Sequence, residues 1–199
     1  MRKKFDYPLL FSVLAISIFG LIMIYSASYV WAEYKFQDPF KFVKNQGIFF
    51  LLGVFLIFLI QKIPTSFFEK YCKKFLILCI ILLICVLIPG LGTVRNGSRS
   101  WFGIGSFGIQ PSEFTKLAAI LFTSHYLVKH EKKMKSFRHG ILPILGLILF
   151  LFFLIMLQPD FGTGMILVMS MMGLLFVGGV PFQFFLKLGV LGVIGIVGL

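Results

Sequence analysis

Long apolar segments, separated by short polar or glycine- and proline-rich breaks, run through almost the whole chain. Seven such segments occur, at residues 9 to about 30, 47–60 with its flanks, 75–88, 111 to about 128, 140–157, 161–180 and from 182 onwards. Apolar runs of about 20 residues with few charges are typical of helices that cross a bilayer. The pattern therefore predicts an all-α, polytopic transmembrane helix bundle of about seven spans, forming a single domain over residues 1–199.

Composition agrees with a membrane protein. Hydrophobic residues make up 59% of the chain and the mean hydropathy is +1.00. The net charge of +12 invites a nucleic-acid partner, but the basic residues lie at the ends of apolar runs and form no surface stripe. They therefore report membrane topology and exclude nucleic-acid binding. The first apolar run lacks a convincing cleavage site, which favours a retained anchor over a signal peptide.

Lysine and arginine are distributed unevenly between the two sides of the predicted bundle. With a cytoplasmic N-terminus, thirteen of the 19 lie on the cytoplasmic side, five lie on the other side and Lys116 lies within a span. Because short cytoplasmic loops are enriched in these residues, we expect the N-terminus to be cytoplasmic. The loop 95–110 and the turn 158–162 then face outwards.

The seventh apolar segment is too short to cross the membrane after its last charge. Twelve residues follow Lys187. They extend roughly 18 Å as a helix, against a hydrocarbon core of about 30 Å. We therefore expect the chain to be truncated in or just after the seventh span.

Glu113 and Lys116 are the first candidates for chemistry. They are three residues apart, so they share a helix face and can form an ion pair. Charged pairs at the end of a span usually face a bundle interior or a wet cavity. Alternatively, Glu113 stabilises the start of the helix and Lys116 extends to the interface. The residues alone do not separate these readings.

Asp160 is the only acidic residue after Glu131. Its place before Phe161 and Gly162 favours a helix N-cap. A carboxylate facing an outward cavity near Lys116 is the alternative.

Arg95 and Arg99 lie in the outward loop among glycine, serine and asparagine residues. Arginines beside free backbone N–H groups suit a phosphate or diphosphate, and interfacial arginines also bind lipid headgroups. Cys72, Cys79 and Cys85 form no CxxC pair, so we expect no metal site. No cofactor is evident. A divalent cation is compatible with the sequence but is not indicated by it.

Four motifs, in order along the chain, resemble one family. MIYSAS, NGSRSWFGIG, QPSEFTKLA and QPDFGTG are similar to motifs of the SEDS family, the membrane proteins of bacterial shape, elongation, division and sporulation. The resemblance covers essentially the whole chain. The segments VWAEYKF and IPGLGTVRNGSRSW are most similar to the stage V sporulation protein E branch, which is itself similar to the FtsW branch.

The resemblance implies a ten-span helical protein in the bacterial cytoplasmic membrane. Such a protein polymerises lipid II as a peptidoglycan glycosyltransferase, together with a class B penicillin-binding protein and among membrane lipids. The essential aspartate of the family lies in a large outward loop beyond residue 199, so no catalytic residue is assigned here. The residues that map onto the polar cavity of the family are Arg99, Ser112, Glu113, Lys116 and Asp160.

Three functions are compatible with this sequence. The first is a lipid II polymerase, whose activity in this chain alone is doubtful without the aspartate. The second is a lipid II flippase or transporter, because an internal polar cavity suits transport equally well. The third is an inactive fragment that only docks a penicillin-binding protein.

Overall fold

The computed structural model describes residues 6–95, 97–103, 108–134 and 136–197, with side chains to residue 190. Arg2, Lys3, Lys4 and Lys135, counted above for topology, lie outside the described residues, as does Asn96. Each of the seven predicted apolar segments contains a helix, which confirms the all-α bundle. The chain forms two compact units, Met1–Pro64 and Thr65–Leu199. The organisation as a single domain stays a prediction.

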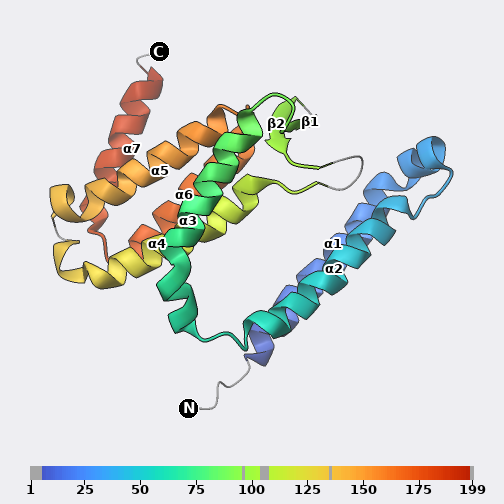
Figure 1. Ribbon diagram of the computed structural model, residues 1–199, viewed down its shortest axis with the longest axis horizontal. Coiled ribbons are helices and arrows are strands. Elements are labelled where there is room, and N and C mark those ends of the chain that lie inside the picture. Colours follow the sequence, from blue (N-terminus) through green and yellow to red (C-terminus); the bar gives the residue numbers. More distant parts are fainter. Residues whose placement is uncertain (1–5, 96, 104–107, 135, 198–199) are drawn as a thin grey trace. The chain divides into compact units, whose positions relative to one another are not determined.

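The first unit is a hairpin of two long helices, α1 (Tyr7–Phe36) and α2 (Lys41–Ile60) (Figure 1). Helix α1 begins at an N-cap, where the Asp6 carboxylate accepts a hydrogen bond from the Leu9 N–H at 3.1 Å. It ends at Gln37, whose left-handed φ of 53° stops the helix. In the turn, the Lys44 ammonium donates to Asp38 at 2.8 Å and holds the pKa of that carboxyl below its usual value. Asp38 also accepts a hydrogen bond from the Phe40 N–H at 3.0 Å, so the turn contains a backbone bond as well as an exposed ion pair.

The second unit contains five α-helices and one small hairpin of strands. The helices are α3 (Thr65–Leu87), α4 (Pro111–Lys129), α5 (Leu142–Met156), α6 (Phe161–Val177) and α7 (Phe182–Val197). Strands β1 (Thr93–Arg95) and β2 (Ser98–Trp101) connect α3 to α4. A 3-10 turn at Glu131–Lys133 and a π-helical turn at Phe137–Ile141 connect α4 to α5. Helix α4 packs against both α3 and α6, and α6 packs against α5.

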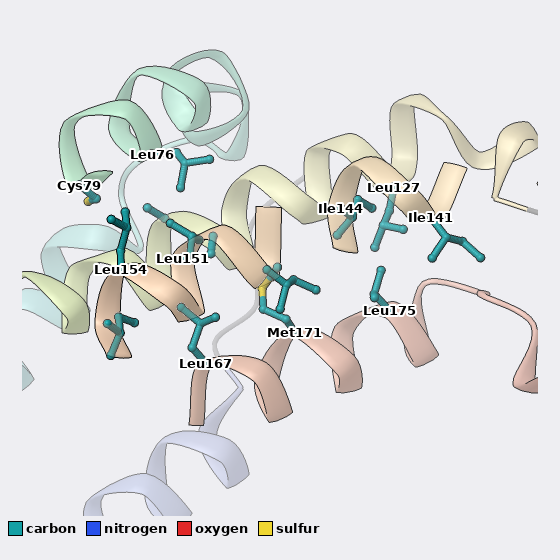
Figure 2. Close-up of a cluster of buried hydrophobic side chains, with 14 of the residues drawn as sticks. Leu76, Cys79, Leu127, Ile141, Ile144, Leu151, Leu154, Leu167, Met171 and Leu175 are labelled. Carbon is teal, nitrogen blue, oxygen red and sulfur yellow. The ribbon is translucent and has the colours of Figure 1, made fainter. Parts of the chain in front are cut away.

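The core of this unit is built from side chains at alternating spacings of three and four residues. Figure 2 shows these side chains pointing towards one another from neighbouring helices. The regular spacing gives α3 and α5 one buried stripe each. The stripes comprise Cys72, Leu76, Cys79, Leu83 and Val86 on α3, and Ile144, Ile148, Leu151 and Ile155 on α5.

The buried face of α4 is different because it consists mainly of small or hydroxyl-bearing residues. Five of them have no solvent exposure: Ser112, Thr115, Ala118, Ala119 and Thr123. Small residues let helix backbones approach closely, which is how helices pack where lipid removes the hydrophobic driving force. This face explains why α4 contacts two helices at once.

Within the described residues, three helical stretches are long and apolar enough to cross a membrane by themselves. They are Tyr7–Phe36, Lys41–Ile60 and Phe137–Met156, while Phe161–Val177 is apolar but shorter. Helix α3 is long, but its first half carries Glu69, Lys70, Lys73 and Lys74. The length and hydropathy of these helices support the conclusion that the chain is a membrane protein.

The small-residue face of α4 generates the first prediction. The substitution Ala119→Leu forces extra methyl groups into a site with no exposed surface, so we expect a loss of about 1–3 kcal/mol of unfolding free energy. Unfolding of the purified chain in detergent measures it. Ala27→Leu, at an exposed position of α1, is the matched control and should leave stability unchanged. Equal stability of the two variants would contradict close packing at Ala119.

Candidate functional site

The candidate site lies at one end of the second unit, where the β-hairpin, the start of α4 and the start of α6 meet. We call this region the polar end and define it by Ser98, Arg99, Gln110, Ser112, Glu113, Lys116, Gln158 and Asp160. The definition includes the five site residues predicted from the sequence, whose role in a site stays a prediction.

The hairpin was predicted as an irregular glycine-rich loop, and the structure gives it order. Strands β1 and β2 pair in antiparallel fashion, with Val94 opposite Arg99. The Thr93 hydroxyl donates to the Trp101 carbonyl at 3.0 Å, and the Arg95 guanidinium lies 5.0 Å from the centre of the Trp101 ring. A cation over an indole ring is a favourable contact. The hairpin therefore forms a defined arm beside α3 and α4.

Arg99 is half-buried on this arm. Gly92 makes room for it, because a Cβ atom on Gly92 would come within 3.0 Å of the Arg99 Cγ. Among the described residues, no hydrogen bond or ion pair joins Arg99 to Glu113, Lys116 or Asp160. The arm brings Arg99 to the same end as these residues without direct contact.

Gln158 anchors the hairpin to the helices. Its backbone carbonyl accepts a hydrogen bond from the Ser98 hydroxyl, and its side-chain Nε2 donates to the Leu83 carbonyl at 3.3 Å. The side chain is completely buried, and its Oε1 atom has no hydrogen-bond partner within the described part of the chain. One residue thus connects the hairpin, α3 and the turn before α6.

Asp160 joins the starts of two helices. Its Oδ1 accepts from the Thr163 N–H at 3.2 Å, which is the predicted N-cap of α6. Its Oδ2 accepts from the Gln110 side-chain Nε2 at 2.7 Å, and Gln110 is the N-cap residue of α4. We call this arrangement the Gln110–Asp160 clasp. The N-cap is confirmed, and the second oxygen contacts Gln110 instead of Lys116.

Glu113 and Lys116 form the predicted ion pair on α4. The Lys116 Nζ lies 2.8 Å from Glu113 Oε1. The Lys116 side chain is only 18% exposed, whereas that of Glu113 is 55% exposed. Glu113 also lies in the first turn of α4, where a negative charge is favoured by the helix dipole. The pair therefore holds one cation in a largely buried place.

Ser112 precedes this pair and faces the interior. Its side chain is fully buried, and its Oγ has no hydrogen-bond partner in the described ranges. The described residues also contain no group of three side chains suited to hold a metal ion. The chemistry available at the polar end is therefore that of paired charges and hydrogen bonds.

Sequence reasoning missed Ser98, Gln110 and Gln158. The two glutamines carry a shared signal, because each immediately precedes a proline that starts a helix or turn. Gln110 has the extended backbone that a following proline favours, whereas Gln158 lies in the turn after α5, where its N–H donates to the Ile155 carbonyl at 3.0 Å. The contact between Gln110 and Asp160 spans 50 residues, so spacing alone gives no sign of it.

Comparison with known proteins now identifies the family. A family model described as "Cell cycle protein", FtsW/RodA/SpoVE, matches residues 7–199. The chain belongs to this family. The FtsW/RodA/SpoVE family is the SEDS family that the four motifs indicate.

Two curated relatives match almost the whole chain. Stage V sporulation protein E of Bacillus subtilis (strain 168) is 46% identical over 98% of this chain and 53% of its own length. A probable peptidoglycan glycosyltransferase FtsW of Saccharophagus degradans is 34% identical over 98% of this chain and 50% of its own. The chain thus spans about half the length of these FtsW/RodA/SpoVE relatives.

Solved structures support the fold. The crystal structure of the Thermus thermophilus rod shape determining protein RodA has a TM-score of 0.75 at 28% identity, and covers 97% of this chain and 60% of that one. A chain of a peptidoglycan synthase complex that coordinates polymerization and crosslinking has a TM-score of 0.63 at 24% identity. This match covers 91% of the present chain and 52% of the chain in that complex. The second likeness concerns the fold alone.

The Gln110–Asp160 clasp generates a stability prediction. Asp160→Ala removes an N-cap and a second hydrogen bond, so we expect a loss of about 2 kcal/mol of unfolding free energy. Asp6→Ala is the matched control, because Asp6 caps α1 with one exposed hydrogen bond at 3.1 Å. It should cost about 1 kcal/mol or less. Denaturant unfolding measures both, and a smaller loss for Asp160→Ala than for Asp6→Ala would contradict the clasp.

Gly92 generates a second prediction about the hairpin. An added Cβ would lie against the backbone carbonyl of Val86, so Gly92→Ala should displace the hairpin and cost about 1–3 kcal/mol. Trp101 fluorescence in a Trp31→Phe background reports the displacement. Gly146→Ala on α5 meets no atom within 4 Å and should be neutral or slightly stabilising. An unchanged Trp101 spectrum in Gly92→Ala would show that the hairpin does not depend on this close approach.

Proposed function

We propose that this chain supplies the first helices and the polar end of a peptidoglycan glycosyltransferase that polymerises lipid II. Membership of the FtsW/RodA/SpoVE family supports the proposal, as do relatives named peptidoglycan glycosyltransferase. Because the chain covers about half of those relatives, the activity is proposed for the complete enzyme. The setting is the bacterial cytoplasmic membrane, with several spans and an outward-facing polar end.

The observation that carries this proposal is the Lys116–Glu113 pair. The Lys116 side chain is 18% exposed and its ammonium lies 2.8 Å from the Glu113 carboxylate, which gives a held positive charge near the start of α4. In a site shielded from water, such a charge interacts with an anion far more strongly than it does in bulk solvent. A lipid-linked diphosphate is an anion of the required class.

The reaction needs a base and a cation. The hydroxyl oxygen of one sugar attacks the anomeric carbon of another, the bond to the diphosphate oxygen breaks, and the hydroxyl proton passes to a carboxylate. Lys116, or Arg99 on the hairpin, offsets the negative charge that develops on the leaving diphosphate. Both Asp160 oxygens already accept hydrogen bonds within the chain, so we do not assign the base to Asp160. We assign the base to the family aspartate expected beyond residue 199.

The remaining residues of the polar end act as supports. Glu113 positions the Lys116 ammonium, and Asp160 fixes the starts of α4 and α6. Ser112 presents a buried hydroxyl in the turn that carries Glu113. The proposed partner is a class B penicillin-binding protein that crosslinks the product.

Substitution of the ion pair tests the proposal. A chimera of residues 1–199 and the second half of the Bacillus subtilis relative provides a full-length enzyme. In it, Lys116→Ala or Glu113→Ala should lower the yield of polymer from lipid II by roughly 10²-fold or more, because a preorganised charge is lost. Expression and monodispersity should persist. Polymer is measured with the purified chimera and its penicillin-binding partner.

The matched control is the Lys44–Asp38 pair. It has the same 2.8 Å separation, but its lysine side chain is 64% exposed. Lys44→Ala should leave the polymer yield unchanged. Parental yield from Lys116→Ala would defeat the role of Lys116, and no polymer from the unsubstituted chimera would defeat the proposal for this chain. Movement of lipid II across vesicles without polymer would favour a flippase, and binding of the partner with neither activity would favour docking.

A further inference from the structure

Helix α3 carries a basic and aromatic surface at the end opposite the β-hairpin. It consists of Phe67, Lys70, Tyr71 and Lys74, which we call the basic face of α3. These residues are spaced by three and four positions, so they lie on one side of the helix. The buried stripe that begins with Cys72 and Leu76 lies on another side. The basic face is therefore not part of the core.

The two lysines of this face share one aromatic ring. Lys70 Nζ lies 5.5 Å from the centre of the Tyr71 ring and Lys74 Nζ lies 5.8 Å from it. The Phe67 ring lies 4.8 Å from the Tyr71 ring and extends this surface. Two ammonium groups four residues apart on a helix repel each other. An anion placed between them would remove that repulsion.

No carboxylate of the described chain supplies this anion. The nearby Glu69 is directed to His125 on α4, with 3.4 Å between Oε1 and Nδ1. Within the described ranges, no ion pair involves Lys70, Lys73 or Lys74. The sequence offers few alternatives, since it holds 7 acidic and 19 basic residues. The counter-ion is therefore expected from outside the chain.

The same side of α3 continues as an exposed apolar surface. Ile77, Leu78 and Ile81 follow at helical spacing and are each about half exposed. From Lys74 to the end of α3 the helix rises about 20 Å, less than a hydrocarbon core of about 30 Å. Lys70 and Lys74 therefore lie towards the opposite face of the core, where long lysine side chains can extend to the headgroup level. A ligand that fits is anionic at one end and apolar along its length.

We propose that the basic face of α3 binds the headgroup of an anionic phospholipid, with the acyl chains along Ile77, Leu78 and Ile81. The charge and the continuous apolar surface both match a phospholipid of the bilayer leaflet at that end. An acidic protein segment would satisfy the lysines but would leave the apolar surface unused. This binding is independent of the proposed glycosyltransferase activity.

Native mass spectrometry of the 199-residue chain tests the proposal. The chain is released from an equimolar mixture of phosphatidylglycerol and phosphatidylcholine, and the ratio of the two bound lipids is measured. The unsubstituted chain should retain mainly phosphatidylglycerol. Lys70→Gln/Lys74→Gln should lower the bound ratio roughly 10-fold, because each lysine near a membrane surface contributes to anionic-lipid binding. Tyr71→Leu keeps the charge but removes the ring, and should lower the ratio less.

The matched control is Lys132→Gln/Lys133→Gln. It removes the same charge from the exposed 3-10 turn, where no aromatic contact holds the lysines in the described residues. In this control variant, the ratio of bound phosphatidylglycerol to bound phosphatidylcholine should change less than two-fold. Equal losses in both double variants, or no preference in the parent chain, would overturn the proposal. If phosphatidylglycerol gives no enrichment while soluble polyglutamate binds through Lys70 and Lys74, the surface serves an acidic protein and the proposal is wrong.

Discussion

The close approach of α4 to its neighbours is the constraint on which the second unit depends. No large side chain separates the helices between Ser112 and Thr123 on the buried face of α4, so backbone packing supplies the contact. Thr115 is accommodated because its hydroxyl donates to the Pro111 carbonyl at 2.9 Å, within the same helix. A hydroxyl satisfied in this way needs no partner across the interface, which permits α4 to contact both α3 and α6. The positions of the β-hairpin and of the start of α6 follow from this packing.

The Gln110–Asp160 clasp joins the starts of α4 and α6 at the polar end. The N-termini of α4 and α6 both carry partial positive charge, which would oppose their approach. Asp160 resolves the conflict because its carboxylate accepts from the Thr163 backbone and from the Gln110 amide. Gln110 is neutral and donates a hydrogen bond without adding a competing charge. Both Asp160 oxygens are thus occupied by hydrogen bonds within the chain, whereas the Glu113 partner of Lys116 is 55% exposed.

The sequence predicted the apolar centre of every helix but not the polar ends. Helix α1 extends beyond the predicted residue 30 to Phe36, and α2 begins at Lys41 rather than near residue 47, because interfacial polar residues continue a helix without an apolar signal. The β-hairpin was missed although Asn96-Gly97 is a strong turn signal. At the polar end, the Glu113–Lys116 pair and the Asp160 cap followed from local spacing. The bonds of Gln110 and Gln158 depend on tertiary packing across 50 and 75 residues, which no local pattern encodes.

The two lysine–carboxylate pairs at 2.8 Å differ in which partner is exposed to solvent. Lys44–Asp38 and Lys116–Glu113 are both 2.8 Å apart, yet their lysine side chains are 64% and 18% exposed. Two charges about 4 Å apart interact by about 1 kcal/mol in water and by about 4 kcal/mol at an effective dielectric constant of 20. The exposed pair therefore adds little to the turn. In the α4 pair the carboxylate is the more exposed partner, at 55%, so solvent reaches Glu113 while most of the Lys116 side chain is covered. In the proposed reaction, a diphosphate that meets Lys116 would compete with Glu113 for the same ammonium.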